Sequence, residues 1–346
     1  MFTELLKEKN LPPLLPKEEM MALMQSEVYG KIPAKPDKME FSVEKNVIPR
    51  FCAGKAICNG VTITCHMGEK IFSFPIHATL PTDGKKHPFF VHVNFRPDNP
   101  DRYQPTEELI DNGFAVLSFC YESVASDDND FTNGLAGVLF ENGERTADDD
   151  PGKIAMWAWG AHRLMDYAET VSDKLDLSRS IVCGHSRTGK AALLAGATDT
   201  RIQFTYSNNS GCTGAALSRG KFGETVDRIT DLFPYWFCKN YRKYASKEYT
   251  MPFDQHYLLA SIAPRKVLVG SGSTDYVADF QSEQLACLAA SPAFEKGFAC
   301  SVLAVAGETF FEGDIGYHLR EGEHAFKQED WKRVIEFVNH HTEKTK

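Results

Sequence analysis

A serine, an aspartate and a histidine follow three separate apolar segments of this chain, and residues of these types can together perform nucleophilic catalysis. Ser186 lies within the motif Gly184-His-Ser-Arg-Thr-Gly-Lys190. An apolar, β-branched segment precedes the motif at 180–183, and an apolar helical segment follows it at 190–197. A strand, a sharp turn and a helix push a hydroxyl out of a sheet and set it beside backbone N–H groups that can hold an oxyanion. The motif therefore predicts a nucleophilic serine, although a glycine-rich turn with a capping serine has the same composition.

A serine hydroxyl needs a base to take its proton, and the base needs an acid to hold its tautomer. On a mostly parallel sheet these partners are expected after later strands, in the order serine, acid, histidine. Asp275 follows the apolar run 266–270, and His324 lies in a loop just before the last expected helix. The chain order therefore predicts a triad of Ser186, Asp275 and His324.

Other residues compete for the two supporting roles. His318, beside Tyr317, is the rival base, although its apolar neighbours favour a structural histidine. Glu308 and Glu321 are the next candidates for the acid. An aspartate after a strand is also common as a turn or capping residue, so the order of the three groups carries the prediction rather than any one of them.

The elements that must position these residues alternate in the second half of the chain. Two period-2 runs at 61–66 and 71–77 predict an antiparallel hairpin near the N-terminus. Apolar runs predict strands at 89–95, 114–120, 180–183, 202–207, 266–270 and 300–305. Helical spacing predicts helices at 152–171, 190–197, 227–244, 280–290 and 328–341. An antiparallel start that feeds repeated strand–helix units predicts an α/β fold whose mostly parallel sheet is covered on both faces.

Size and composition are those of an ordinary globular enzyme. The 346 residues are 42% hydrophobic and 25% charged, and a net charge of −9 without a basic block argues against nucleic-acid and membrane partners. Nine cysteines without metal-like spacing are expected to be reduced, and the lack of a signal-like segment predicts a cytoplasmic protein. Residues 1–38 are expected to form an arm packed on a single main domain, 39–346. The acidic loops 127–130 and 148–150 are expected to be solvated surface rather than a metal site.

The serine motif resembles that of the glucuronoyl esterases, family 15 of the carbohydrate esterases. That family carries Gly-Cys-Ser-Arg-x-Gly-Lys, from which this chain departs only at His185. The similarity extends from about residue 85 to the C-terminus. It includes Trp157-Ala-Trp-Gly160, Ser210-Gly-Cys-Thr-Gly214, Phe222-Gly-Glu-Thr-Val226, Phe233-Pro-Tyr-Trp-Phe-Cys238, Pro252-Phe-Asp-Gln-His256 and Ile262-Ala-Pro-Arg265. The resemblance implies an α/β-hydrolase fold, a three-layer sandwich around the central sheet.

The resemblance also implies roles for three further residues. Arg187 would stabilise the oxyanion, and Lys190 and Glu224 would bind sugar hydroxyls. Taken alone, Lys190 would be interpreted as an exposed helix lysine and Glu224 as an acid in the first turn of a helix. A second oxyanion donor is expected from the loop that contains Asn94-Phe-Arg96.

Two positions depart from the family pattern. Many members carry the triad acid as a glutamate where this chain has Asn209, so the acid is assigned to Asp275. A tryptophan often stands two residues after that acid and forms a wall of the uronate pocket, whereas this chain has Val277. Tyr276 would compensate only if its ring turned inward.

Together these features predict a serine esterase that acts on a carbohydrate-linked ester, most consistent with an alkyl or aryl ester of a uronic acid, through an acyl-enzyme. No metal or organic cofactor is expected, and the only expected partner is a small carbohydrate ester. One alternative is a sugar or xylan O-deacetylase that uses the same triad. A second is a catalytically weak hydrolase-fold binding protein, which Asn209 would favour. The oligomeric state, and whether the loop 121–150 closes over the pocket, are left open.

Overall fold

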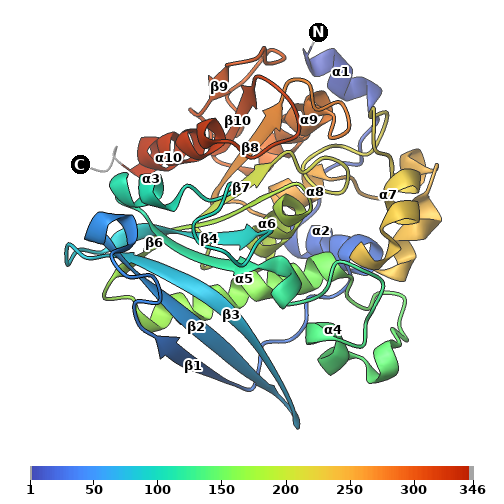
Figure 1. Cartoon of the computed structure of the whole chain (residues 1–346). Coiled ribbons are helices and arrows are strands. Elements are labelled where there is room, and N and C mark those ends of the chain that lie inside the picture. The colour runs from blue at the N-terminus through green and yellow to red at the C-terminus, as the bar shows by residue number, and fades with distance from the viewer. Residues whose placement is uncertain (1, 343–346) are drawn as a thin grey trace.

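The computed structural model describes residues 2–342, in which ten strands form one continuous sheet in the order β1-β2-β3-β5-β4-β6-β7-β8-β10-β9 (Figure 1). The six strands from β5 to β10 in this order run parallel to one another, whereas β1, β2, β3 and β9 pair antiparallel. The strands are β1 (Lys38–Glu44), β2 (Ala56–Met67), β3 (Lys70–Pro81), β4 (His87–Asn94), β5 (Ala115–Cys120), β6 (Leu175–His185), β7 (Phe204–Asn208), β8 (Lys266–Gly272), β9 (Thr309–Phe310) and β10 (Ile315–Arg320). The predicted mostly parallel sheet with an antiparallel N-terminal hairpin is confirmed.

Helices cover both faces of this sheet and complete three layers (Figure 1). The larger apolar core lies between the sheet and α5, α6, α8 and α9, while α3 and α10 pack on the opposite face. The helices are α1 (Phe2–Glu8), α2 (Lys17–Met24), α3 (Thr106–Asp111), α4 (Gly134–Leu139), α5 (Lys153–Thr170), α6 (Arg187–Thr198), α7 (Val226–Leu232), α8 (His256–Ala260), α9 (Phe280–Ala290) and α10 (Gln328–Thr342). Among the described residues, no helix combines the length and apolar character that crossing a membrane requires.

The N-terminal segment packs along the helices at one end of the sheet. α2 contacts α8, and α1 contacts α9. Met20, Met24 and Tyr29 are buried, and the Tyr29 hydroxyl donates to the carbonyl oxygen of Thr213 at 2.6 Å. The segment therefore supports the loop that follows β7.

Two stretches of the chain differ from their expected secondary structure. The predicted helix at 227–244 is only partly formed, because α7 ends at Leu232 and Pro234 supplies no backbone N–H to continue it. Short 3₁₀ turns follow at Pro234–Trp236 and Lys239–Tyr244. The predicted strand at 300–305 is wrong, since these residues form an irregular loop in which Val302 and Val305 are 52% and 63% exposed.

The last parallel strand is instead β10, whose polar residues do not fit the sequence pattern of a buried strand. All six of its residues are buried, including His318 and Arg320. The Tyr206 hydroxyl oxygen lies 2.9 Å from His318 Nε2, and Arg320 Nε donates to Asp330 Oδ2 at 3.0 Å. The side chains of His318 and Arg320 therefore both have hydrogen-bond partners within the core. His318 is thus a structural histidine, as predicted.

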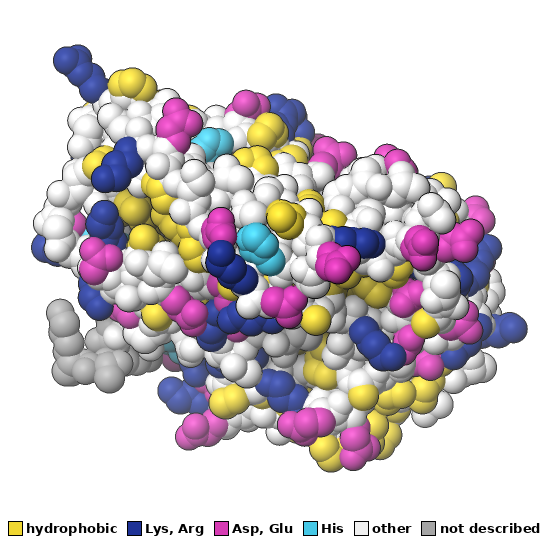
Figure 2. All heavy atoms as spheres, turned by 90° about the horizontal axis from the view of Figure 1, so that it is seen from below, with side chains coloured by type: hydrophobic (Ala, Val, Ile, Leu, Met, Phe, Trp, Pro, Cys, Tyr) yellow, Lys and Arg dark blue, Asp and Glu magenta, His cyan; other side chains and the backbone are white. Residues whose placement is uncertain are grey.

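The surface seen in Figure 2 mixes acidic and basic side chains, with small apolar areas between them. Basic residues do not gather into one continuous patch on that face.

Candidate active site

Ser186 occupies a tight turn between β6 and α6. Its backbone angles, φ 56° and ψ −126°, lie in a region that residues other than glycine rarely adopt, and such strain clusters at functional sites. The Ser186 N–H donates to Asn208 O at 2.8 Å, which ties the turn to the end of the neighbouring strand β7. A Cβ atom at Gly184 would lie 2.3 Å from Thr188 O, so the close approach of strand and helix requires glycine there. The strand–turn–helix predicted around Ser186 is therefore present.

Asp275 and His324 meet at the same edge of the sheet. They follow β8 and β10, which are parallel neighbours whose last residues, Gly272 and Arg320, pair with each other. The His324 Nδ1 atom lies 2.5 Å from Asp275 Oδ2. The Asp275 side chain is buried, whereas that of His324 is 43% exposed. This contact leaves the Nε2 edge of the imidazole available to a hydroxyl group.

The Asp275 carboxylate is held by more than the histidine. Asn209 Nδ2 donates to Oδ2 at 2.7 Å, and the N–H of Ala278 donates to Oδ1 at 3.1 Å. Burial alone would raise the pKa of Asp275, but the hydrogen bonds from His324 and Asn209 bring it below its ordinary value of 3.8. Asn209 thus supports the acid rather than replacing it.

Arg320 is a supporting residue that the sequence did not indicate. Its guanidinium donates to the carbonyl oxygens of Glu321, Glu323 and Ala325 at 2.8 to 3.0 Å. These bonds surround the loop that carries His324. Buried and paired with Asp330, Arg320 therefore fixes the backbone on either side of the histidine.

His185, where the family carries cysteine, packs directly against His324. The two ring centroids are 4.6 Å apart, and His185 Nδ1 lies 2.6 Å from Asn208 Oδ1. Burial lowers the pKa of His185 to about 3, so this ring is neutral at physiological pH. His185 is therefore an uncharged ring that packs against the exposed imidazole of His324.

A pocket of 330 Å³ brings the predicted site residues together. Its lining residues are Ser186, Arg187, Lys190, Asn209, Ser210, Gly211, Glu224, Phe233, Trp236, Asp275, Val277, Ala278 and His324. Val277 forms part of the wall, but Tyr276 does not line the pocket and is 68% exposed. The aromatic wall is therefore not restored by Tyr276. In the described part of the chain, no group of three or more His, Cys, Asp or Glu side chains is placed to hold a metal ion.

Arg187 follows the serine and pairs with Asp127 from the loop after β5. The guanidinium carbon also lies 4.9 Å from the ring centroid of Trp236. Asp127 is 7% exposed at its side chain, so the expectation that the loop 127–130 is simply solvated is wrong at this residue. A carboxylate in an Asp-rich loop looks solvated in the sequence because its cationic partner is 60 residues away.

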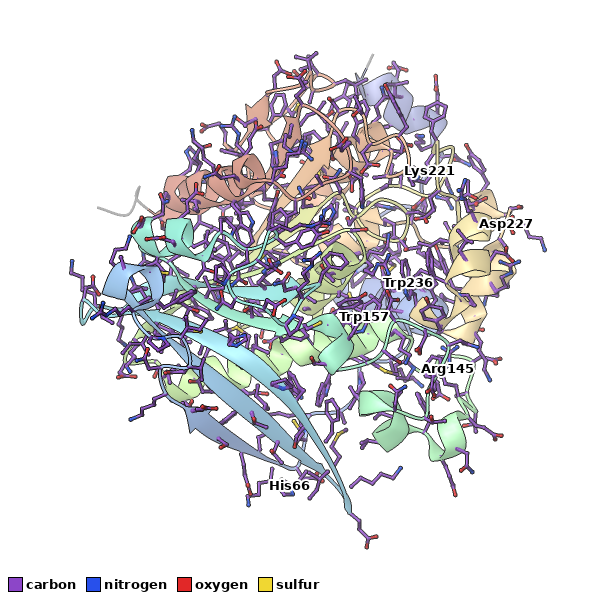
Figure 3. The ribbon with its side chains drawn as sticks, in the orientation of Figure 1. His66, Arg145, Trp157, Lys221, Asp227 and Trp236 are labelled. Atoms are coloured by element: carbon purple, nitrogen blue, oxygen red, sulfur yellow. The ribbon has the colours of Figure 1, made fainter. Side chains whose placement is uncertain are left out.

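Aromatic residues tie that loop to the pocket. Trp157 of α5 donates from Nε1 to Ala125 O of the loop at 2.8 Å, and it meets Trp236 edge to face with 6.3 Å between the ring centroids. Both tryptophans are labelled in Figure 3. Arg145, labelled in the same view, donates from Nη1 to Phe237 O at 2.6 Å. The loop 121–150 is thus bound to the segment that contributes Phe233 and Trp236 to the pocket.

Lys190 is buried, so its interpretation as an exposed helix lysine is wrong. Its ammonium group donates to the carbonyl oxygens of Ser210 and Cys212, each at 2.5 Å. Burial lowers the pKa of Lys190, and Glu224 opposes that effect. Glu224 precedes α7 rather than lying in its first turn, and its N–H donates to Val277 O at 3.1 Å.

Glu283 on α9 is a further buried group that the sequence did not single out. Its Oε1 accepts from the Gly211 N–H at 2.8 Å, and its Oε2 accepts from Ser271 Oγ at 2.5 Å. Burial raises the pKa of Glu283 to about 7. The only signal in the sequence is that Glu283 is the single charged residue of this helix. Through Gly211, Glu283 holds one wall of the pocket.

The expected second oxyanion donor is not found in the pocket. Asn94 is buried at the end of β4 and donates from Nδ2 to Asp101 Oδ2 at 3.2 Å. Neither Asn94 nor Arg96 lines the pocket around Ser186, and Arg96 borders a separate hollow with His77 and Ser118.

The three-layer fold and the serine turn are those of the α/β hydrolases. A family model described as "Glucuronyl esterase, fungi" matches residues 63–296. A curated carbohydrate esterase of an unknown prokaryotic organism is 33% identical over 372 residues, covering 94% of this chain and 84% of that protein. The chain therefore belongs to the glucuronoyl esterase family, whose members are carboxylic ester hydrolases.

Other relatives agree with this assignment. The 4-O-methyl-glucuronoyl methylesterase of Hypocrea jecorina is 28% identical over 268 residues, and the chain spans about half of its length (53%). The solved structure of a promiscuous CE15 esterase from the marine bacterial metagenome is 32% identical, with a TM-score of 0.84 over 94% of this chain and 91% of that one. The glucuronoyl esterase from Solibacter usitatus is 31% identical, with a TM-score of 0.84 over 93% and 91%.

Proposed function

We propose that this chain hydrolyses an ester of a uronic acid by attack of Ser186 on the ester carbonyl. The observation that carries the proposal is the bond between His324 Nδ1 and Asp275 Oδ2 in a pocket that also contains Ser186. The relatives whose names specify a substrate are 4-O-methyl-glucuronoyl methylesterases, which supports a uronate as the acid.

The proposed reaction has two stages. His324 takes the proton of Ser186 Oγ as the oxygen attacks the carbonyl carbon, and Asp275 stabilises the imidazolium. The tetrahedral oxyanion collapses, the ester C–O bond breaks and His324 returns the proton to the departing alcohol. Water, deprotonated by His324, then attacks the acyl carbon, the bond from this carbon to Ser186 Oγ breaks, and His324 returns the proton to Oγ as the uronic acid leaves. Arg187 is the proposed cation at the developing oxyanion.

Two residues are proposed to recognise the sugar. An ammonium group has three donors, and Lys190 uses two of them on Ser210 and Cys212, which leaves one for a ligand. Glu224 lines the same pocket and can accept from a hydroxyl. The Lys190 ammonium group as a donor and the Glu224 carboxylate as an acceptor are suited to adjacent hydroxyl groups of a pyranose ring.

The first experiment is hydrolysis of methyl and benzyl glucuronate by the purified protein and by the Ser186→Ala variant. We expect turnover that the variant lacks. Labelling of Ser186 with a fluorophosphonate in parallel shows whether the serine is reactive. A labelled serine without turnover of either ester would contradict the uronate assignment and leave the esterase chemistry in place.

Val277 favours a second candidate function, the removal of acetyl groups from sugars. With Val277 in place of a tryptophan, this side of the pocket offers less contact to a uronate ring and leaves room for other acyl groups, and one similar structure is described as a promiscuous esterase. Acetylated xylose and methyl glucuronate, compared by kcat/KM on the same protein, separate the two functions. The cytoplasmic location stays a prediction.

A further inference from the structure

Asp127, beside the catalytic pocket, has a carboxylate that contacts three side-chain donors. Its Oδ2 pairs with Arg187 Nη1 and also accepts from the Tyr121 hydroxyl at 2.8 Å. Its Oδ1 accepts from Trp236 Nε1 at 2.7 Å. Both carboxylate oxygens are thus engaged, and all three donors come from segments that surround the serine turn.

The backbone around Asp127 is held as firmly as its side chain. Its carbonyl oxygen accepts from the Tyr235 hydroxyl at 3.1 Å. Trp157 Nε1 donates to Ala125 O at 2.8 Å, and Lys153 Nζ donates to Asp130 O at 2.6 Å. A carboxylate fixed on both sides can act as a rigid support for the cation that it contacts.

Arg187 has guanidinium N–H groups that Asp127 does not occupy. An arginine carries five N–H donors, and the pair with Asp127 uses Nη1. The Nε atom is buried and has no hydrogen-bond partner among the described residues, so it is not the accessible donor. The guanidinium carbon lies 4.9 Å from the Trp236 ring centroid and 5.7 Å from that of Phe233. The side chain lines the pocket and is 29% exposed, so part of the guanidinium remains accessible to a ligand atom.

Asp127 also offsets the cost of burying the Arg187 charge. Burial alone would lower the pKa of the guanidinium, but Asp127 raises it above the ordinary value. The arginine therefore keeps its charge in a partly desolvated site, where a fixed charge acts strongly on a developing oxyanion.

We propose that Asp127 is a positioning residue for the oxyanion site: it holds the Nη1 edge of Arg187 against Trp236, so that the exposed part of the guanidinium faces the oxyanion formed on attack by Ser186. The inference rests on the proposed role of Ser186 as nucleophile. It assigns no contact between Asp127 and the substrate, because the carboxylate acts through the arginine.

Asp127→Asn tests this role, because the amide keeps the shape and one acceptor oxygen but loses the charge. The first readout is the rate of Ser186 labelling by a fluorophosphonate, which needs no uronate. We expect labelling to slow by at least about 10-fold, compared with about 10²–10³-fold for loss of an oxyanion donor itself. Asp128→Asn, an exposed acid on the same loop, is the matched control and should label at the wild-type rate.

A double-variant cycle separates positioning from a general loss of structure. If Asp127 acts through Arg187, then Asp127→Asn added to Arg187→Met should slow labelling no further than Arg187→Met alone. On any ester that is turned over, kcat should fall while KM changes little. Additive effects in the double variant, or wild-type labelling of Asp127→Asn, would overturn the proposal.

The outcomes distinguish this proposal from the proposed function. Labelling that depends on Asp127, without hydrolysis of glucuronate esters, would support the positioning role and reject the substrate. Absence of labelling in the wild-type protein would reject both, since there would be no reactive serine whose oxyanion needs a site.

Discussion

Glu283→Gln should remove a pH dependence from the stability of this protein. Glu283 is fully buried, and burial raises its pKa to about 7 from an ordinary value of 4.5. A group whose pKa is raised on folding stabilises the native state fully below the unfolded value, and that contribution is lost as the pH rises through the folded value. The stabilisation by Glu283 is therefore lost between pH 4.5 and about pH 7.

The size of the effect follows from the difference between the unfolded and the folded pKa of Glu283. At about 1.4 kcal/mol for each pH unit between them, the contribution of Glu283 is about 3 kcal/mol. That is a large part of the roughly 5–15 kcal/mol by which a native domain is stable. The introduced glutamine does not titrate, so the difference in unfolding free energy between the two proteins should shift by this amount in favour of the variant between pH 4.5 and about pH 8.

Urea unfolding followed by tryptophan fluorescence at several pH values measures this difference. The pKa of Asp330, raised by burial to about 6, lies in the same range, but that group is present in both proteins and cancels in the comparison. The amide also changes the bonds to Ser271 and Gly211, which adds an offset that does not vary with pH. A difference that stays constant from about pH 5 to about pH 8 would refute the reasoning.

Four further predictions concern single side chains. Asp275→Asn should lower kcat for ester hydrolysis by about 10³–10⁴-fold with little change in melting temperature, and wild-type turnover would rule out Asp275 as the acid. His185→Cys should lower the unfolding free energy in urea by about 1–3 kcal/mol, because the bond to Asn208 and the ring beside His324 are lost; equal stability would contradict the packing role. Val277→Trp should lower KM for methyl glucuronate several-fold at constant kcat, and an unchanged KM would argue against a missing wall. A thiol reagent should modify Cys300 first in the folded protein, since the other eight of the nine cysteines are buried, and simultaneous modification of several thiols would contradict that order.

The sequence predicted correctly those helices, strands and turns that a short contiguous stretch of residues determines. β6, the turn at Ser186 and α6 form one contiguous apolar–glycine–apolar stretch, and α9 covers the predicted residues 280–290. Asp275 could be found because it follows the predicted strand 266–270, whereas His324 could be found from its place just before the last helix, although the strand expected before it was wrong. Chain order alone therefore located the triad candidates.

The missed strand β10 and the missed burial of Asp127 share one physical cause, which is that their polar groups are satisfied by distant partners. The segment 300–305 is apolar but lies in a loop, while β10 buries His318 and Arg320 because Tyr206 and Asp330 complete their hydrogen bonds. The prediction that Asp127 is solvated surface fails for the same reason, since no residue near it in the chain indicates that it pairs with Arg187. Such pairings depend on the tertiary structure and leave no local pattern.

The loops 221–224 and 275–279 meet at the mouth of the pocket mainly through backbone and capping bonds. The Glu224 N–H donates to Val277 O at 3.1 Å, and the Phe222 N–H donates to Asp279 Oδ2 at 2.8 Å. The side chains of Phe222, Tyr276 and Val277 are 71%, 68% and 59% exposed, so they contribute little to holding the loops together. Substitutions at these three positions should therefore leave the scaffold and the serine turn intact, and those at Val277, the one of the three that lines the pocket, can change which esters the site accepts.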